Sequence, residues 1–87
     1  MRYKMKPLII EAVQWTGFNI DEVKSFVGET LHYGIMHTKD NETYVNMIIE
    51  TSNGNQFCTK GDFIIKDANG EFYPCKPDIF DKTYETV

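Results

Sequence analysis

The chain has 87 residues, so we expect one domain, residues 1–87, with a modest core and no deep enclosed active site. Its net charge is −4 and its nine basic residues are scattered. Both features argue against direct nucleic-acid binding, because phosphate contacts need clustered Lys and Arg. No run of about 18 apolar residues occurs, and the apolar run near the start is too short for a signal peptide. We therefore expect no membrane association.

Residues 7–15 predict the first strand. Their sequence, PLIIEAVQW, is apolar on both faces at its start and alternates more clearly toward its end. This pattern is typical of a strand that is covered on both sides for part of its length. Thr16 and Gly17 then break the strand.

A helix is predicted directly after this break, ending at Gly28, which is a favoured residue just past a helix C-terminus. Asn19 suits the N-cap, and Glu22 three positions later would complete a capping box. Phe18 would contact Val23 as a hydrophobic staple. One stripe of the helix is apolar and is expected to pack on the sheet: Ile20, Val23, Phe26 and Val27.

The middle of the chain predicts antiparallel strands. Residues 31–37 form a candidate strand interrupted by Gly34, and a polar turn follows at 39–42. Residues 44–50 alternate as a half-buried strand does. The inward face of that strand is expected to carry Val45, Met47 and Ile49.

Two turns follow in quick succession. Asn53 and Gly54 predict a turn into a strand at 56–58, because both residue types occur at hairpin turns. Gly61 and Asp62 then predict a tight corner, in which Gly adopts a backbone conformation that other residues resist and Asp accepts backbone hydrogen bonds. These strands form a meander leading into the next hairpin.

Asn69 and Gly70 separate the apolar runs 63–65 and 72–73, a strong hairpin signal since both residues tolerate positive φ. The sheet is expected to end near the prolines at 74 and 77 because proline cannot donate a ladder hydrogen bond.

Pro77 suits the first turn of a short C-terminal helix, where Asp78 would face the positive end of the helix dipole. Phe80 and Tyr84 form an apolar pair at i and i+4, before an extended tail. Together the elements predict an α+β fold: a small, curled, mainly antiparallel sheet of about five to six strands, packed on one N-terminal helix.

The sequence contains no recognisable metal-binding motif. His32 and His37 lie five positions apart, and Cys58 and Cys75 lack the close spacing of a zinc knuckle. We expect no metal or other cofactor, and both cysteines are expected to be free thiols, as in cytosolic proteins. Cys75 has two interpretations, a small buried apolar residue or a thiolate favoured by the charge of Lys76.

Catalytic motifs are also missing from the sequence. Either histidine could pair with Asp40 or Glu42 as an acid–base couple, but no nucleophile stands in a recognisable motif beside them. Neither a P-loop nor a GxGxxG fingerprint occurs. We therefore expect that the protein is not an enzyme.

Asp62 and Tyr73 can be interpreted in two ways. In a structural role, Asp62 caps a turn and Tyr73 lies at the rim of the core. In a functional role, both join Trp15 in a binding surface, since Tyr and Trp are enriched in interface hot spots. The twelve aromatic residues exceed what a small core encloses easily. The candidates for partner or ligand binding are Trp15, Asp62, Lys66, Tyr73 and Asp78.

Both ends of the chain resemble a family of small uncharacterised proteins of tailed phages and prophages. The resemblance rests on KPLIIEAVQWTGFN at 6–19, GDFIIK at 61–66 and GEFYPCKPDIF at 70–80. Family members usually have Pro-Gly-Asp followed by Tyr or Trp, where this chain has Lys60-Gly61-Asp62 followed by Phe63. The resemblance implies a phage or prophage origin and expression in the cytoplasm of the bacterial host, and it implies no catalytic residues.

Our first hypothesis is a phage-encoded, non-enzymatic accessory protein that binds and modulates a host protein, for example an anti-CRISPR-like inhibitor of an anti-phage defence system. The alternative is an oligomeric protein that sequesters a small ligand, such as a nucleotide signal, in pockets between subunits; a homo-oligomer is therefore also considered. A small enzyme or a virion component ranks last.

Overall fold

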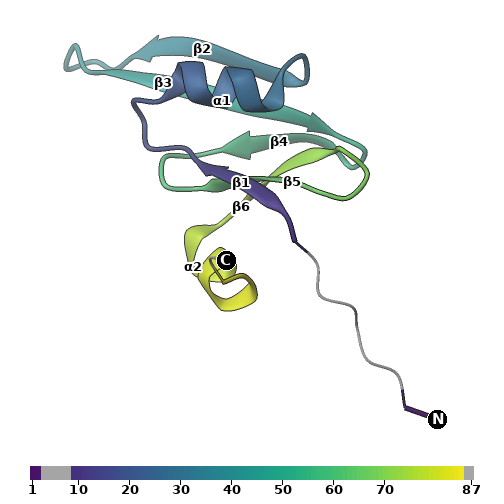
Figure 1. Cartoon of the computed structure of the whole chain (residues 1–87). Coiled ribbons are helices and arrows are strands. Elements are labelled where there is room, and N and C mark those ends of the chain that lie inside the picture. The colour runs from purple at the N-terminus through teal and green to yellow at the C-terminus, as the bar shows by residue number, and fades with distance from the viewer. Residues whose placement is uncertain (3–8, 86–87) are drawn as a thin grey trace.

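The computed structural model describes residues 1–2 and 9–85 and has an α+β fold. The elements run β1 Glu11–Gln14, α1 Ile20–Val27, β2 Leu31–His37, β3 Thr43–Thr51, β4 Gly54–Cys58, β5 Phe63–Lys66, β6 Phe72–Cys75 and α2 Pro77–Thr83 (Figure 1). The predicted class, the six strands and the two helices are confirmed.

The strands form two antiparallel sheets in place of one curled sheet. Sheet A has the order β1-β5-β6, and sheet B has the order β2-β3-β4. The Trp15 N–H donates to the Asp62 carbonyl at 2.8 Å, and the Gly61 N–H donates to the Trp15 carbonyl at 2.7 Å. These bonds extend the β1–β5 pairing into the corner, so the chain after β4 joins β1 and leaves sheet B.

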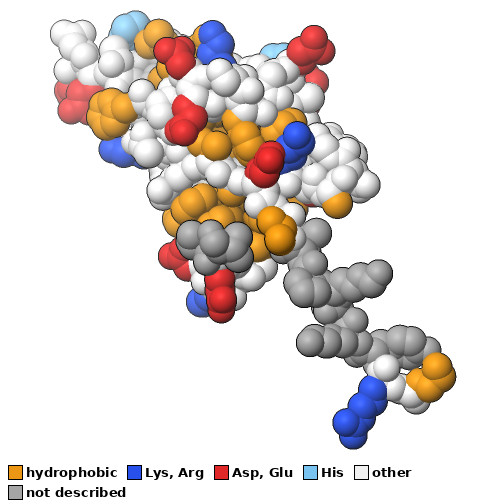
Figure 2. Space-filling model, in the orientation of Figure 1, with side chains coloured by type: hydrophobic (Ala, Val, Ile, Leu, Met, Phe, Trp, Pro, Cys, Tyr) orange, Lys and Arg blue, Asp and Glu red, His pale blue; other side chains and the backbone are white. Residues whose placement is uncertain are grey.

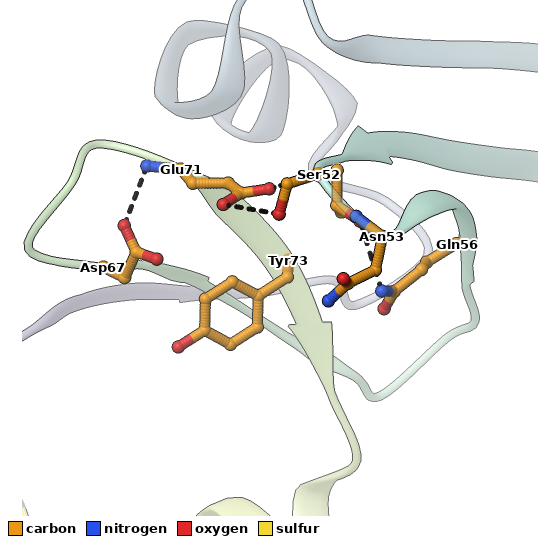
Figure 3. A pocket seen from close by; sticks show the side chains of 7 residues that line it. Ser52, Asn53, Gln56, Asp67, Glu71 and Tyr73 are labelled. Carbon is orange, nitrogen blue, oxygen red and sulfur yellow. Dashed lines mark hydrogen bonds between the residues drawn. The ribbon is translucent and has the colours of Figure 1, made fainter.

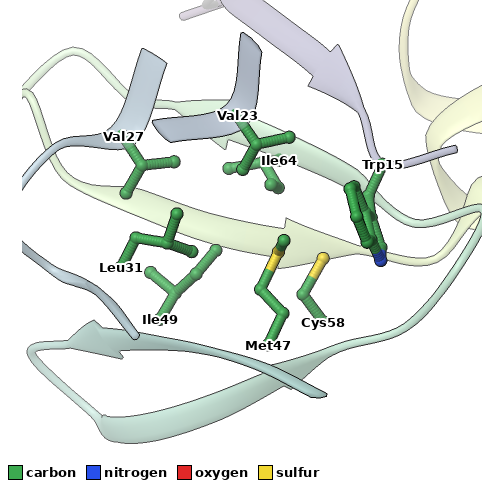
Figure 4. Close-up of a cluster of buried hydrophobic side chains, with 8 residues drawn as sticks. All are labelled: Trp15, Val23, Val27, Leu31, Met47, Ile49, Cys58 and Ile64. Atoms are coloured by element: carbon green, nitrogen blue, oxygen red, sulfur yellow. The ribbon is translucent and has the colours of Figure 1, made fainter. Parts of the chain in front are cut away.

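The core lies where helix α1 and the two sheets meet (Figure 4). The predicted inward face of β3 is confirmed, because Met47 and Ile49 are buried and Val45 is partly buried. The predicted helix stripe is also confirmed, with two of its residues buried and two packed at the edge of the cluster. The buried cluster consists of Trp15, Val23, Val27, Leu31, Met47, Ile49, Cys58 and Ile64.

The start of helix α1 differs from the prediction. Asn19 is the N-cap, but its side chain bonds to no backbone N–H of the helix, so the capping box is wrong. Its Nδ2 donates to the Gln14 carbonyl at 2.8 Å and to Glu22 Oε1 at 2.6 Å. The staple is also wrong, because Phe18 is 89% exposed while Val23 is fully buried. Gly28 ends the helix as predicted, with φ of 83° and its N–H donating to the Lys24 carbonyl.

Strand β2 runs through Gly34 without interruption, because all seven of its residues pair with β3. The turn at 52–53 and the hairpin at 67–71 are confirmed, although Gly70 takes positive φ and Asn69 does not. Asp67 Oδ1 caps the second turn by accepting hydrogen bonds from the Asn69 and Glu71 N–H groups, each at 2.9 Å.

Helix α2 packs on sheet A through aromatic rings. Pro77 occupies its first turn as predicted, and the Phe80 ring stacks on Phe63 with 3.8 Å between centroids. Phe80 also contacts Tyr84, with 5.1 Å between centroids, which confirms the predicted pair. Sheet A continues through Pro74 to Cys75.

Strand β1 is shorter than the prediction of 7–15. It begins at Glu11, and positions 7 and 8 lie outside the described residues. Within the described ranges, 1–2 and 9–85, no helix combines the length and the apolar character needed to cross a bilayer.

Candidate functional site

A groove of about 390 Å³ opens between the loop that follows β1 and the outer part of strand β3. Trp15, Val45 and Cys58 line it from the core side, and Phe18, Tyr44 and Phe57 line its rim. Lys60 carries the single charge among the described lining residues, so the groove is mainly apolar.

One wall of the groove is an ordered loop. Asn19 Oδ1 accepts hydrogen bonds from the Thr16 N–H at 2.9 Å and the Thr16 hydroxyl at 3.0 Å. The aliphatic part of Lys60 lies so close to Gly17 that a Cβ there would be 3.3 Å from Lys60 Cδ. The Lys60 ammonium lies 5.6 Å from the centre of the Phe18 ring. This loop therefore holds Phe18 in an exposed position.

The rim is unusually aromatic for exposed surface. Phe18 is 89% exposed, Phe57 is 66% exposed and Tyr44 is 53% exposed. Leaving large aromatic side chains in water forgoes the stabilisation of burying them, and exposed apolar clusters on globular domains commonly mark interaction sites. The rim aromatics are thus candidates for contact with a partner.

The opposite wall includes open strand backbone. Strand β4 pairs with β3 from Met47 to Thr51, whereas residues 43–46 extend beyond the end of β4. In an antiparallel sheet, alternate backbone N–H and C=O groups point to each side of a strand. The groove therefore lies beside hydrogen-bonding groups that β4 leaves open.

The corner at Gly61 and Asp62 directly follows Thr59 and Lys60, which line the groove. Gly61 has φ of 97°, as the corner prediction requires. Asp62 is 2% exposed, and its Oδ2 accepts from the Thr59 N–H at 2.9 Å, the Thr59 hydroxyl at 3.1 Å and Lys76 Nζ at 3.3 Å. Asp62 therefore caps the turn, and its carboxylate is not part of an exposed binding surface.

The two cysteines are free thiols, and neither is activated. Burial raises the pKa of Cys58 to about 12, with a further contribution from Asp62. Burial is also the main cause that raises the pKa of Cys75, followed by Asp62 and Asp78. Lys76 binds Asp62 and the Thr59 hydroxyl, so the interpretation of Cys75 as a lysine-stabilised thiolate is wrong.

A second, polar pocket of about 210 Å³ lies between the turn after β3 and the β5–β6 hairpin (Figure 3). Glu71 accepts hydrogen bonds from the Ser52 N–H and, at 3.2 Å, from the Ser52 hydroxyl. Tyr73 lines this pocket, and burial is the main cause that raises its pKa. With Asp67 also in its wall, the pocket is acidic, which disfavours phosphate groups.

The candidate binding residues from the sequence are not gathered in one place. Trp15 is 2% exposed and belongs to the core, touching the groove from beneath. Tyr73 is partly buried in the polar pocket, whereas Lys66 and Asp78 are exposed at the end of β5 and the start of α2.

The histidine that has a carboxylate partner in the described structure is His32. His32 Nε2 lies 2.7 Å from Glu50 Oε1, so its partner is neither Asp40 nor Glu42, and both side chains are exposed. Across the part of the chain that the structure describes, no three His, Cys, Asp or Glu side chains are close enough to hold a metal ion.

Sequence reasoning missed Phe18, Tyr44, Phe57 and Lys60 as surface candidates. A signal was present for two of them, because Tyr44 and Phe57 are out of phase with the buried positions of their strands. In Figure 2, apolar side chains gather below helix α1 and beside helix α2, and acidic and basic side chains lie around them.

Comparisons with protein-family models, curated proteins and solved structures found no match for this chain. The resemblance to phage proteins therefore stays a prediction, and the function must be inferred from the site itself.

Proposed function

We propose that this chain is a non-enzymatic binding protein whose apolar groove takes an extended segment of another protein. The observation that carries this proposal is the exposure of Phe18, Tyr44 and Phe57 around a groove with an open strand backbone. Strand addition combines these two features, because the main chain supplies affinity and side-chain pockets supply specificity.

The ordered loop strengthens the proposal. Phe18 is held outward by the hydrogen bonds of Asn19 to Thr16, so little ordering is needed when a partner binds. Pre-organised aromatic anchors lower the entropic cost of association. Lys60 would favour a partner segment that carries an acidic side chain beside its apolar residues.

In the setting that the sequence resemblance implies, the partner is a host protein in the bacterial cytoplasm. The protein would then act as a phage-encoded accessory protein, for example an anti-CRISPR-like inhibitor of a defence system. Nucleotide sequestration has weaker support, because the polar pocket is acidic and the groove offers one lysine to several phosphate charges.

The test is capture from bacterial lysate with matched variants, followed by binding of the purified partner. Phe18→Ala/Phe57→Ala should weaken the dissociation constant by about 30-fold or more, as expected for loss of hot-spot aromatics. Ile79→Ala is the control, since this exposed apolar residue lies on α2, outside the groove lining. Equal binding by the groove variant, or no protein retained, would contradict the proposal.

A thermal-shift screen against nucleotides separates the alternative. A nucleotide present at about 100 times its dissociation constant would stabilise the fold by about 2.7 kcal/mol. Such a shift without any protein partner would favour the ligand-sequestering function instead.

A further inference from the structure

Strand β2 is a free edge of sheet B. It pairs with β3 along its whole length, and in the sheet order it has no neighbour on its other side. Figure 1 shows β2 as the outermost strand, with no described segment beyond it. A free edge presents a row of unpaired N–H and C=O groups that can pair with another strand.

This edge lacks the features that usually protect a free strand. Between Leu31 and His37 there is no Asp, Glu, Lys, Arg or Pro, and the pairing with β3 contains no bulge. After Leu31 every side chain of the strand is exposed, and Ile35 is 67% exposed. Protected edges commonly carry charges, prolines or bulges, so β2 is suited to pairing.

Gly34 provides a second, independent observation. Its φ is not in the left-handed region, and a Cβ at this position would meet no atom within 4 Å. Neither the backbone conformation nor packing against residues 1–2 and 9–85 of the same copy requires glycine here. Glycine inside a strand weakens it and often marks the close approach of another backbone.

We propose that β2 pairs antiparallel with β2 of a second copy about a twofold axis at Gly34. Gly34 then opposes Gly34 of the second copy, and Tyr33 opposes Ile35 on both sides of the axis. Aromatic and β-branched residues form favourable cross-strand pairs. His32 opposes the uncharged Met36, so no like charges face each other, and the strand complements itself in this register.

The dimer would join two copies of sheet B into one continuous six-stranded sheet. It leaves the groove open, because residues 43–46 face the groove on the β4 side of β3 and β2 lies on the other side. The inference therefore does not depend on the proposed function, and each dimer would present two grooves.

The first test is the mass in solution by light scattering and analytical ultracentrifugation. The wild-type chain should be a dimer, and Tyr33→Lys/Ile35→Lys should be monomeric because lysines would then oppose lysines across the axis. Phe57→Lys is the control, since Phe57 is equally exposed but lies on β4, and it should remain dimeric. A wild-type monomer up to millimolar concentration, or a dimer that only Phe57→Lys disrupts, would overturn the proposal.

The second test reads the register and does not depend on the lysine variant folding. In a Cys75→Ser background, Gly34→Cys should form an inter-chain disulfide under mild oxidation because the two copies of position 34 are opposed. Met36→Cys should not, since its two copies are about 14 Å apart along the strands. Cross-linking at position 36 in preference to 34, or at neither position, would contradict the twofold at Gly34.

Discussion

Two regions of the molecule depart in opposite ways from the rule that charged side chains are exposed and large apolar side chains are buried. At the corner, residues 58–62, the carboxylate of Asp62 is buried, and the corner backbone bonds to Trp15 just after β1. In the outer hairpin, residues 33–46, large apolar side chains such as Ile35 and Tyr44 are exposed. The corner is joined to the end of β1 by two backbone hydrogen bonds, whereas the hairpin extends past the end of β4.

The comparison shows that burial in this small protein depends on which segments pack around a residue more than on the type of that residue. Asp62 is tolerated inside because three hydrogen bonds compensate for its lost hydration. The outer hairpin keeps its apolar residues exposed because nothing in the described chain covers them there. These uncovered residues surround both proposed contact sites, the groove and the β2 edge.

The largest expected effect comes from truncating aromatics in the two regions. Trp15→Ala should lower the free energy of unfolding by about 3–5 kcal/mol, because it removes the largest side chain of the buried cluster. Tyr44→Ala in the outer hairpin should cost less than about 1 kcal/mol. Urea unfolding of both variants measures the contrast, and similar losses would show that the hairpin is covered in solution.

A smaller effect is expected for the carboxylates. Asp62→Ala should cost about 2 kcal/mol, because the Thr59 N–H and hydroxyl and the Lys76 ammonium lose their shared acceptor. The matched change Asp40→Ala, at the exposed hairpin tip, should stay within about 0.5 kcal/mol. Chemical denaturation at neutral pH compares them, and equal values would contradict the structural role of Asp62.

The smallest effect considered is the contribution of Cys58, at the corner, to the pH dependence of stability. The folded chain keeps the Cys58 thiol protonated up to a pKa of about 12, whereas an unfolded thiol ionises near 9.0. Between these values the unfolded state binds fewer protons, so this contribution to stability is lost as pH rises. One pH unit above 9.0 the loss is on the order of 1 kcal/mol.

Urea unfolding across the alkaline range measures this loss. Cys58→Ala is the control, because it removes the titrating group while keeping a small apolar side chain in the cluster. An unchanged alkaline slope in that variant would assign the pH dependence to another group.

Local features were predictable wherever neighbouring residues decide the conformation. The helix stripe, the Gly28 end, the corner at Gly61, the β5–β6 hairpin and the Phe80–Tyr84 contact all rest on interactions within a few positions. The capping box and staple failed because Asn19 bonds back to residues 14 and 16, which draws the loop toward sheet A and turns Phe18 outward.

The candidate site was less predictable, because it depends on contacts between residues that are far apart in the sequence. Trp15 and Asp62 are of residue types that are typical of binding surfaces. Both are buried, because long-range backbone hydrogen bonds join Trp15 to the corner. Phe18 and Phe57 are of a residue type that is typical of cores, but both are exposed on the surface. The exposure of Tyr44 and Phe57 follows the alternation of their strands. The burial of Trp15 and the exposure of Phe18 depend on how two sheets share one helix, and no local pattern encodes that arrangement.

The sequence by itself determined the class of fold, the turns and the face that each strand directs inward, because these depend on backbone preference and alternation over short distances. The tertiary structure alone decided that β5 leaves the meander to join β1, that a carboxylate is buried at the corner and that the hairpin keeps an open edge. These outcomes depend on hydrogen bonds between residues some fifty positions apart, such as Trp15 with Asp62, whose partners the local sequence does not specify.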